Sequence, residues 1–502
     1  MSQPLPQSGL TGTSKLKAVS ELMRLLTADL ASSTHMPSQQ RDAALEELKV
    51  YGRDPRNADP IFTKEGIETL TKHAFNSSST ITSRNALRCL ANALLIKPET
   101  RQIFVDLGYA PKACNKLKSA NLDTEFLLSR IIFLTTYGTN VQLQTLIDQH
   151  HLADAIVQNL ARHAKLSGKS ANNSSSMIAG AGAGSSLVAK AKGKETSKAD
   201  PMADMALTET AKLLFNVTHF CQDRVDAFTP AIAPIVTMIC KHDTPQPKPL
   251  EAPVSSLVNA LLTLNLAGKE GSAALFPAKG ETTMLADRLV QLLDLALQNY
   301  SDTELDQAVL PLVTALRKIY ELAPADKVRP ALRAGLLPKA ADRKKVLGWG
   351  DTLAAKLLRH MTNALAPDFR NAVAHMLFEL SDKDATKFVQ NVGYGFASGF
   401  LFQNNVPMPE GATEAFQAAA AADGDNKRVI NAITGQFIDE ETEPDLPEMT
   451  DEEKEREAER LFVLFERLRR TGIVNVENPV ATALREGRFQ QIDDDKRVEE
   501  LD

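Results

Sequence analysis

The sequence is poor in aromatic residues and in cysteine. Only 5% of its 502 residues are aromatic, and Trp349 is the single tryptophan. The four cysteines are scattered without a CxxC pair, which argues against a disulfide framework, so we expect buried thiols in a reducing compartment. No apolar run approaches the roughly 20 residues that span a bilayer, and residues 1–14 lack the apolar core of a signal peptide. We therefore expect a cytoplasmic protein without a membrane span.

The motifs that usually carry catalysis are also missing. No Gly stands five residues before Gly168-Lys169-Ser170 or before Gly193-Lys194, so there is no phosphate-binding GxxxxGK[ST] loop. The glycines at 180, 182 and 184 follow no strand pattern, and the adjacent His150 and His151 point to different faces of a helix. We expect no catalytic residue, no metal, no cofactor, no direct nucleotide binding and no bond-making enzyme.

Charge is unevenly distributed along the chain. Residues 437–502 hold 21 acidic and 10 basic residues, a net of −11, which leaves +5 for the remainder. An acidic tail of this kind either steers partners and folds back on the body, or simply keeps the protein in solution. No strongly basic face with interleaved aromatics is visible, so we expect no nucleic-acid partner.

Blocks of sequence recur along the chain. Arg84-Asn85-Ala86 is followed by an apolar helical stretch and Gly108-Tyr109, and Arg370-Asn371-Ala372 is followed in the same way by Gly393-Tyr394. Self-similarity with a period in the low forties, in helical segments, indicates stacked helical repeats, and residues 86–117 have the helix, short helix, Gly, helix layout of an armadillo repeat. We predict an all-α, armadillo/HEAT-type right-handed α-solenoid, a fold that binds other macromolecules along an extended face.

Composition suggests five parts. We expect a disordered N-terminus, a solenoid interrupted by a Ser, Gly, Ala and Lys-rich disordered insertion, an acidic Pro-containing linker, a tail helix and an acidic C-terminus. Their predicted bounds are 1–14, 15–402 with the insertion at 167–199, 403–449, 450–472 and 473–502.

The tail helix is well specified by the sequence. Thr450 and Glu453 form a capping box, and Gly472 ends the pattern. Its apolar face comprises Leu461, Phe462, Leu464, Phe465 and Leu468. This amphipathic helix either packs on the solenoid or contacts a partner.

Polar side chains interrupt the apolar helices of the solenoid. The candidates are Asn92, Asn216 and Asn265, with Arg88, Arg130 and Lys212 close by. An Asn amide in such a helix can bond the backbone of a bound peptide, or it can satisfy a loop carbonyl within the stack. The cations suit the carboxylates of an acidic helix or a chain terminus, or they are merely exposed to solvent.

With the repeats laid out, the chain resembles the synembryn (resistance to inhibitors of cholinesterase) family, in its fungal branch. The resemblance extends from about Leu16 to Pro479. It rests on Arg84–Asn92, Arg130–Thr135, Leu213–Val217, Val392–Gly395 and Asn431–Gly435, and most specifically on the tail from Met449 onward.

This resemblance implies a monomeric chaperone and guanine nucleotide exchange factor for heterotrimeric G-protein α subunits (Gα). In such a protein the concave face takes the Gα C-terminal helix, with Asn92, Arg130 and Asn216 as contacts, and the tail contacts the GTPase core near its switch region. Animal members carry a Ser/Thr-rich acidic phosphorylation cluster, whereas residues 411–429 here hold only Thr413. Thr442 is the remaining candidate for phosphorylation. The alternative is a generic armadillo scaffold or adaptor.

Overall fold

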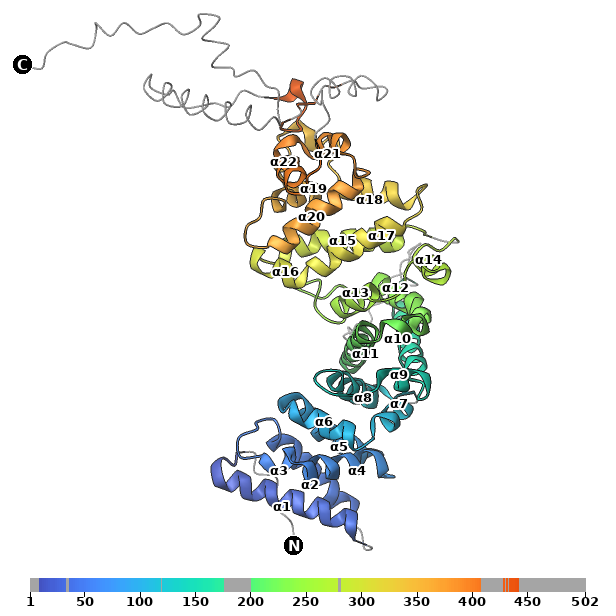
Figure 1. Ribbon diagram of the computed structural model, residues 1–502, viewed down its shortest axis with the longest axis vertical. Helices are drawn as coiled ribbons and strands as arrows, with labels where there is room; N and C mark the ends of the chain where they lie inside the picture. The colour runs from blue at the N-terminus through green and yellow to red at the C-terminus, as the bar shows by residue number, and fades with distance from the viewer. Residues whose placement is uncertain are drawn as a thin grey trace, which may run out of the picture. The chain divides into compact units, whose positions relative to one another are not determined.

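Helices form nearly all the regular structure in the described part of the chain (Figure 1). The computed structural model describes residues 9–32, 36–118, 120–175, 200–278, 281–407, 428, 430–431 and 433–441, without the side chains of 168–175. Two compact units are present: unit 1 lies within 1–337 and 350–380, and unit 2 within 338–349 and 381–502.

In unit 1 the α-helices are α1 (Gly12–Ala31), α2 (Ser38–Tyr51), α3 (Asp59–Phe62), α4 (Lys64–Asn76), α5 (Thr80–Ile96), α6 (Glu99–Asp106), α7 (Ala110–Lys118), α8 (Leu122–Thr135), α9 (Leu143–Asp148), α10 (Leu152–Ser175), α11 (Pro201–Phe220), α12 (Ile232–Lys241), α13 (Val254–Leu262), α14 (Lys269–Leu275), α15 (Met284–Asn299), α16 (Leu305–Ala308), α17 (Leu310–Leu322), α18 (Val328–Leu336), α19 (Leu353–His360) and α20 (Pro367–Leu380). Unit 2 contains α21 (Ala385–Val392) and α22 (Tyr394–Gln403).

Unit 1 is a stack of helices in two rows. The first row runs α2, α5, α8, α11, α13, α17 and α20, each in contact with the next. The second row runs α7, α10, α12, α15 and α18 in the same manner. Because each helix buries its apolar face against neighbours from the preceding and following repeats, only the stack as a whole forms a core. The predicted all-α solenoid of armadillo/HEAT type is confirmed.

Hydrogen bonds between repeats follow the period that the sequence suggested. Lys116 Nζ on α7 donates to the carbonyl of Ala74 near the end of α4, 42 residues away, at 3.0 Å. Arg162 Nη1 on α10 donates to the carbonyl of Ala120, again 42 residues away, at 2.9 Å. Helix C-termini leave carbonyls without intrahelical partners, and a cation from the next repeat satisfies them here.

The repeat predicted at residues 86–117 is confirmed as α5, α6 and α7. Pro98 caps the start of α6, where its missing N–H costs nothing. Gly108 separates α6 from α7 with φ of +71°, in the left-handed region that only Gly adopts without strain. The sharp turn places α7 in the second row.

Two predicted boundaries differ from the structure. Helix α1 begins at Gly12, inside the segment expected to be a disordered N-terminus. Helix α10 continues to Ser175, nine residues into the predicted insertion at 167–199. Once a helix is nucleated, each added residue costs little, so a long amphipathic helix can extend through poor helix formers. The rest of the insertion, 176–199, lies outside the described residues.

In unit 2, part of the predicted acidic, Pro-containing linker at 403–449 lies against another segment of the unit. Ile430 and Phe437 form an antiparallel bridge, and the segment between them lies against the loop 343–347. Arg343 holds the two together: its Nη1 donates to the Gly435 carbonyl at 2.8 Å. This guanidinium is buried, and burial lowers its pKa.

The docked segment is also held by its backbone shape. Gly435 has φ of +69°, and a Cβ at this position would lie 2.4 Å from Leu347 Cδ1. Only a glycine fits so closely. The Asn-x-x-Thr-Gly sequence therefore specifies a bound turn, and its composition alone looked like a linker.

Candidate partner-binding groove

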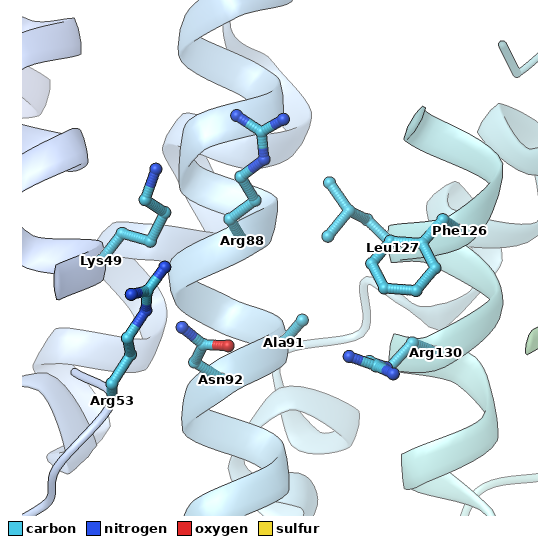
Figure 2. Close-up of a pocket in the computed structure, with 8 residues that line it drawn as sticks. All are labelled: Lys49, Arg53, Arg88, Ala91, Asn92, Phe126, Leu127 and Arg130. Atoms are coloured by element: carbon cyan, nitrogen blue, oxygen red, sulfur yellow. The ribbon is translucent and has the colours of Figure 1, made fainter. Parts of the chain in front are cut away.

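The first row of unit 1 carries a cavity of about 220 Å³ between α2, α5 and α8. Its lining comprises Lys49, Arg53, Arg88, Ala91, Asn92, Phe126, Leu127 and Arg130 (Figure 2). We call this site the cationic groove. It brings together three of the predicted contact residues: Arg88, Asn92 and Arg130.

Helical spacing explains how the cationic groove is built. Arg88 and Asn92 are four residues apart on α5, as are Phe126 and Arg130 on α8, so each pair projects from one face of its helix. Lys49 on α2 and Arg53, in the turn that follows it, repeat the spacing. Three neighbouring helices of the row thus direct matching positions to one surface.

The four cations of the groove differ in how far they are neutralised. Lys49 forms an ion pair with Glu46 on its own helix. Arg88 bonds Asn85 at 3.1 Å and lies 3.7 Å from Glu46 and 3.8 Å from Asp123. Both acids are partly exposed, so these contacts are weak.

Arg53 and Asn92 are the uncommitted groups of the groove. Arg53 is exposed, and its side chain forms no ion pair or hydrogen bond with a residue that the structure describes. Asn92 is half-buried, and its amide has no hydrogen-bond partner among the described residues. Both groups can therefore bind a ligand without breaking an existing contact.

Arg130 is held at the wall of the groove. Its guanidinium lies 4.6 Å from the centre of the Phe126 ring, a cation–π contact. Its Nη2 donates to Glu209 Oε1 at 3.0 Å. Lys212 donates to the same oxygen at 3.2 Å, which places Lys212 beside the groove, one helix further along the row.

The Asn216 amide forms its hydrogen bonds within the helical stack, rather than being free to bond the backbone of a bound peptide. Its Nδ2 donates to Thr136 Oγ1 at 2.7 Å, and its Oδ1 accepts from the Tyr137 hydroxyl at 3.2 Å. The side chain is buried. A buried amide with both ends satisfied joins α11 to the end of α8, so we leave it out of the contact surface.

Asn265 does not interrupt a helix, contrary to the prediction. Helix α13 ends at Leu262, and Asn265 lies in the following loop, where its Nδ2 donates to Asp226 at 2.9 Å. The apolar pattern of residues 254–266 suggested one long helix, but the helix ends before Asn265 and a loop follows.

An exposed aromatic cluster that sequence reasoning missed extends from the groove. Tyr137 packs edge-on against Phe133 and Phe220, with ring centres 5.3 and 6.1 Å apart. Residues 126, 130, 133 and 137 follow one helical stripe, a signal that was present in the sequence. Large exposed aromatics are common anchors at protein interfaces.

Other predicted features can be placed only in part. Burial raises the pKa of the Cys89 thiol to about 12, which makes it inert.

Among the described residues there is no group of three or more His, Cys, Asp or Glu that could hold a metal. No helix in the same part of the chain has the length and apolar composition of a membrane span. Thr442 and the tail residues Leu461, Phe462, Leu464, Phe465 and Leu468 lie outside the described residues.

The stacked helices define an α-solenoid of the armadillo/HEAT class. A family model described as "Guanine nucleotide exchange factor synembryn" matches residues 44–488, and the chain belongs to this family.

Similar proteins include chaperones from fungi and vertebrates. A synembryn-like chaperone of Schizosaccharomyces pombe is 29% identical over 46% of this chain and 45% of its own length. Chaperone Ric-8A of Danio rerio is 25% identical over 86% of this chain and 81% of its own length. Chaperone Ric-8A of Macaca fascicularis is 24% identical over 88% of this chain and 83% of its own length.

Two solved structures align with parts of this chain. An engineered protein aligns with 83% of this chain and 89% of its own, at 15% identity and a TM-score of 0.43. A designed armadillo repeat protein aligns with 63% of this chain and 98% of its own, at 13% identity and a TM-score of 0.33.

Proposed function

We propose that this protein binds heterotrimeric Gα subunits, nascent or loaded with GDP, as a folding chaperone and guanine nucleotide exchange factor. Membership of the synembryn family supports the activity. The cationic groove supports a binding mode, because it offers an extended surface rather than an enclosed catalytic pocket. Because Gα subunits are made and act in the cytoplasm, we propose that this protein is cytoplasmic. We also propose that it works as a monomer.

Exchange of this kind needs no bond chemistry. A protein that binds nucleotide-free Gα more tightly than nucleotide-loaded Gα must weaken nucleotide binding by the same factor, since the two equilibria are linked. GTP, by binding Gα, then releases the complex. A nascent Gα is stabilised by the same preference, because binding to one folded state shifts the folding equilibrium towards it.

The single observation that carries the binding mode is the pair of uncommitted groups, Arg53 and Asn92. A chain terminus or acidic side chain of the Gα C-terminal helix would pair with the guanidinium of Arg53. The Asn92 amide, which both donates and accepts, would bond the peptide backbone. Arg88 and Arg130 add positive charge, and the aromatic cluster at Tyr137 suits apolar residues of the same helix.

The tail supplies the second proposed contact. Leu461, Phe462, Leu464, Phe465 and Leu468 form an apolar face in the sequence pattern, which we assign to the GTPase core near its switch region. Two contacts on one Gα raise the affinity by avidity, since the second forms within the complex.

The test is to isolate the complex without nucleotide. Purified GDP-loaded Gα is mixed with this protein, separated by size exclusion, and the complex is assayed for bound nucleotide. We expect a one-to-one complex that lacks GDP and dissolves when GTP is added. A complex that retains GDP, or that ignores GTP, contradicts the proposal.

A further inference from the structure

Unit 2 exposes an apolar patch around the only tryptophan. Trp349 is 73% exposed, and Val346, Ile433 and Ile438 are 38%, 62% and 51% exposed. Large apolar side chains gathered at one place on a surface mark a binding site more often than chance.

These four side chains belong to two segments that run beside each other. The Leu347 amide donates to the Thr434 carbonyl at 3.3 Å, and the Phe437 amide donates to the Arg343 carbonyl at 2.9 Å. Leu347 and Thr434 are the chain neighbours of Val346 and Ile433, and Phe437 is the neighbour of Ile438. The segments 346–349 and 433–438 therefore lie side by side, and we treat their exposed apolar side chains as one patch.

Charged residues of both signs border the patch. At the end that follows Ile438, Asp439 and Glu440 pair with Arg428, and Glu441 accepts hydrogen bonds from Asn431 and Thr434. The other end is cationic. Lys344 and Lys345 directly precede the patch, both exposed, and neither forms an ion pair with a residue that the structure describes. A complementary partner would therefore combine an apolar face with carboxylates at one end.

We propose that residues 450–472 of the same chain cover this patch when no partner is bound. In sequence, Leu461, Leu464, Phe465 and Leu468 share one helical face. Residues 451–459, which precede it, hold six carboxylates against two cations and would face Lys344 and Lys345.

The chain also brings the two surfaces together. The described part ends at Glu441, three residues after Ile438, and the eight residues 442–449 can span about 30 Å when extended. A short tether of this kind gives an effective concentration on the order of millimolar. Even a weak apolar contact is then largely formed within one molecule.

A tail bound to the patch would regulate Gα binding, and this regulatory role rests on the proposed function. The apolar face assigned above to Gα would be covered in the free protein, so Gα binding would have to displace it. The tail would then hold the protein in a restrained state until a partner arrives.

The single tryptophan makes the patch directly measurable, and no Gα is needed. Emission of Trp349 and its quenching by acrylamide are recorded for the full chain, at several concentrations, and for two double variants. One carries Leu461→Ser and Phe465→Ser on the apolar face. The matched control carries Arg456→Ser and Arg470→Ser on the opposite face.

We expect blue-shifted emission and low quenching in the full chain and in the control. The apolar-face variant should show red-shifted emission and several-fold stronger quenching. Equal exposure of Trp349 in all three proteins would overturn the proposal. Protection that the apolar-face variant retains would also overturn it, because another segment would then cover the patch. Protection that appears only as concentration rises would assign the patch to a second copy. Since the assay contains no Gα, its failure leaves the proposed function untouched.

Discussion

Glu209 on α11 accepts a hydrogen bond from Arg130 on α8 at 3.0 Å, so an almost buried carboxylate fixes one wall of the cationic groove. The same carboxylate binds Lys212. It therefore both orients the groove and offsets part of its positive charge, and this dual role can be tested.

Glu209→Gln keeps the shape of the side chain and removes its charge. We expect the groove to bind an acidic peptide more tightly, by roughly 1 kcal/mol for a nearby charge in a watery site, which is about fivefold. The gain should shrink with added salt, because exposed charges are screened. Titration calorimetry at two ionic strengths measures both. Unchanged affinity at low salt would mean that Arg130 and Lys212 do not face the ligand.

Arg53→Ala and Asn92→Ala should each weaken Gα binding without unfolding the protein. Loss of the charged contact of Arg53 should cost about 1.5–3 kcal/mol, or roughly a tenfold or greater rise in Kd. Loss of the neutral hydrogen bond of Asn92 should cost about 0.5–1.5 kcal/mol, or roughly a two- to tenfold rise. Thermal stability should be unchanged, because neither side chain has a partner among the described residues. Arg24→Ala, an exposed cation on α1, is the matched control. An equal loss of Gα affinity in the control would mean that the effect comes from the net charge of the protein and not from the cationic groove.

Asn216→Ala should have the opposite profile. The variant leaves the hydroxyls of Thr136 and Tyr137 without their shared partner, at a cost of about 1–3 kcal/mol of unfolding free energy. Gα affinity, measured below the melting temperature, should be kept. Weakened binding with normal stability would instead restore Asn216 to the contact surface.

Gly435→Ala should release the docked segment of unit 2. The new methyl group would meet Leu347 Cδ1 at 2.4 Å, at a backbone φ of +69°. We expect faster hydrogen exchange and proteolysis over residues 430–441. The control is Gly399→Ala on α22, where a Cβ meets nothing within 4 Å and a small gain in stability is expected. Unchanged protection in Gly435→Ala would show that the segment is not held there.

Stability should depend on pH through His242. Its Nε2 lies 3.1 Å from Asp204 Oδ1, and this hydrogen bond raises the pKa of His242 above its ordinary value of 6.5. A raised folded-state pKa means that the stabilisation is fully present below the unfolded value and is lost as pH rises through the folded value. His242→Asn should therefore cost more unfolding free energy at pH 5.5 than at pH 8.5, as urea titrations would show. An equal cost at both pH values would contradict this.

The sequence predicted the helices and their stacking because both depend on local spacing. The layout of residues 86–117 was visible as apolar periodicity with a Pro and a Gly at its turns. Half of the predicted groove residues meet in one cavity for the same reason, since Arg88 and Asn92 share a face of one helix. Lys49 and Arg53 show the same spacing and were overlooked among many other charged residues.

What could not be predicted depends on contacts between distant residues. Thr136 is 80 residues from Asn216, so nothing near Asn216 shows that its amide is already bonded. Gly435 is 92 residues from Arg343, and the turn that contains Gly435 looks like a linker until that partner is known. Apolar periodicity does not show which distant partner a given polar side chain bonds.

The most direct test of the account is the initial rate of GDP release from Gα. The rate is measured alone, with the wild-type protein, with a variant that combines Arg53→Ala and Asn92→Ala, and with Arg24→Ala. We expect acceleration by the wild type and by Arg24→Ala, and a loss of about tenfold or more in the combined variant at limiting protein. Acceleration that the combined variant retains would show that the cationic groove does not carry exchange.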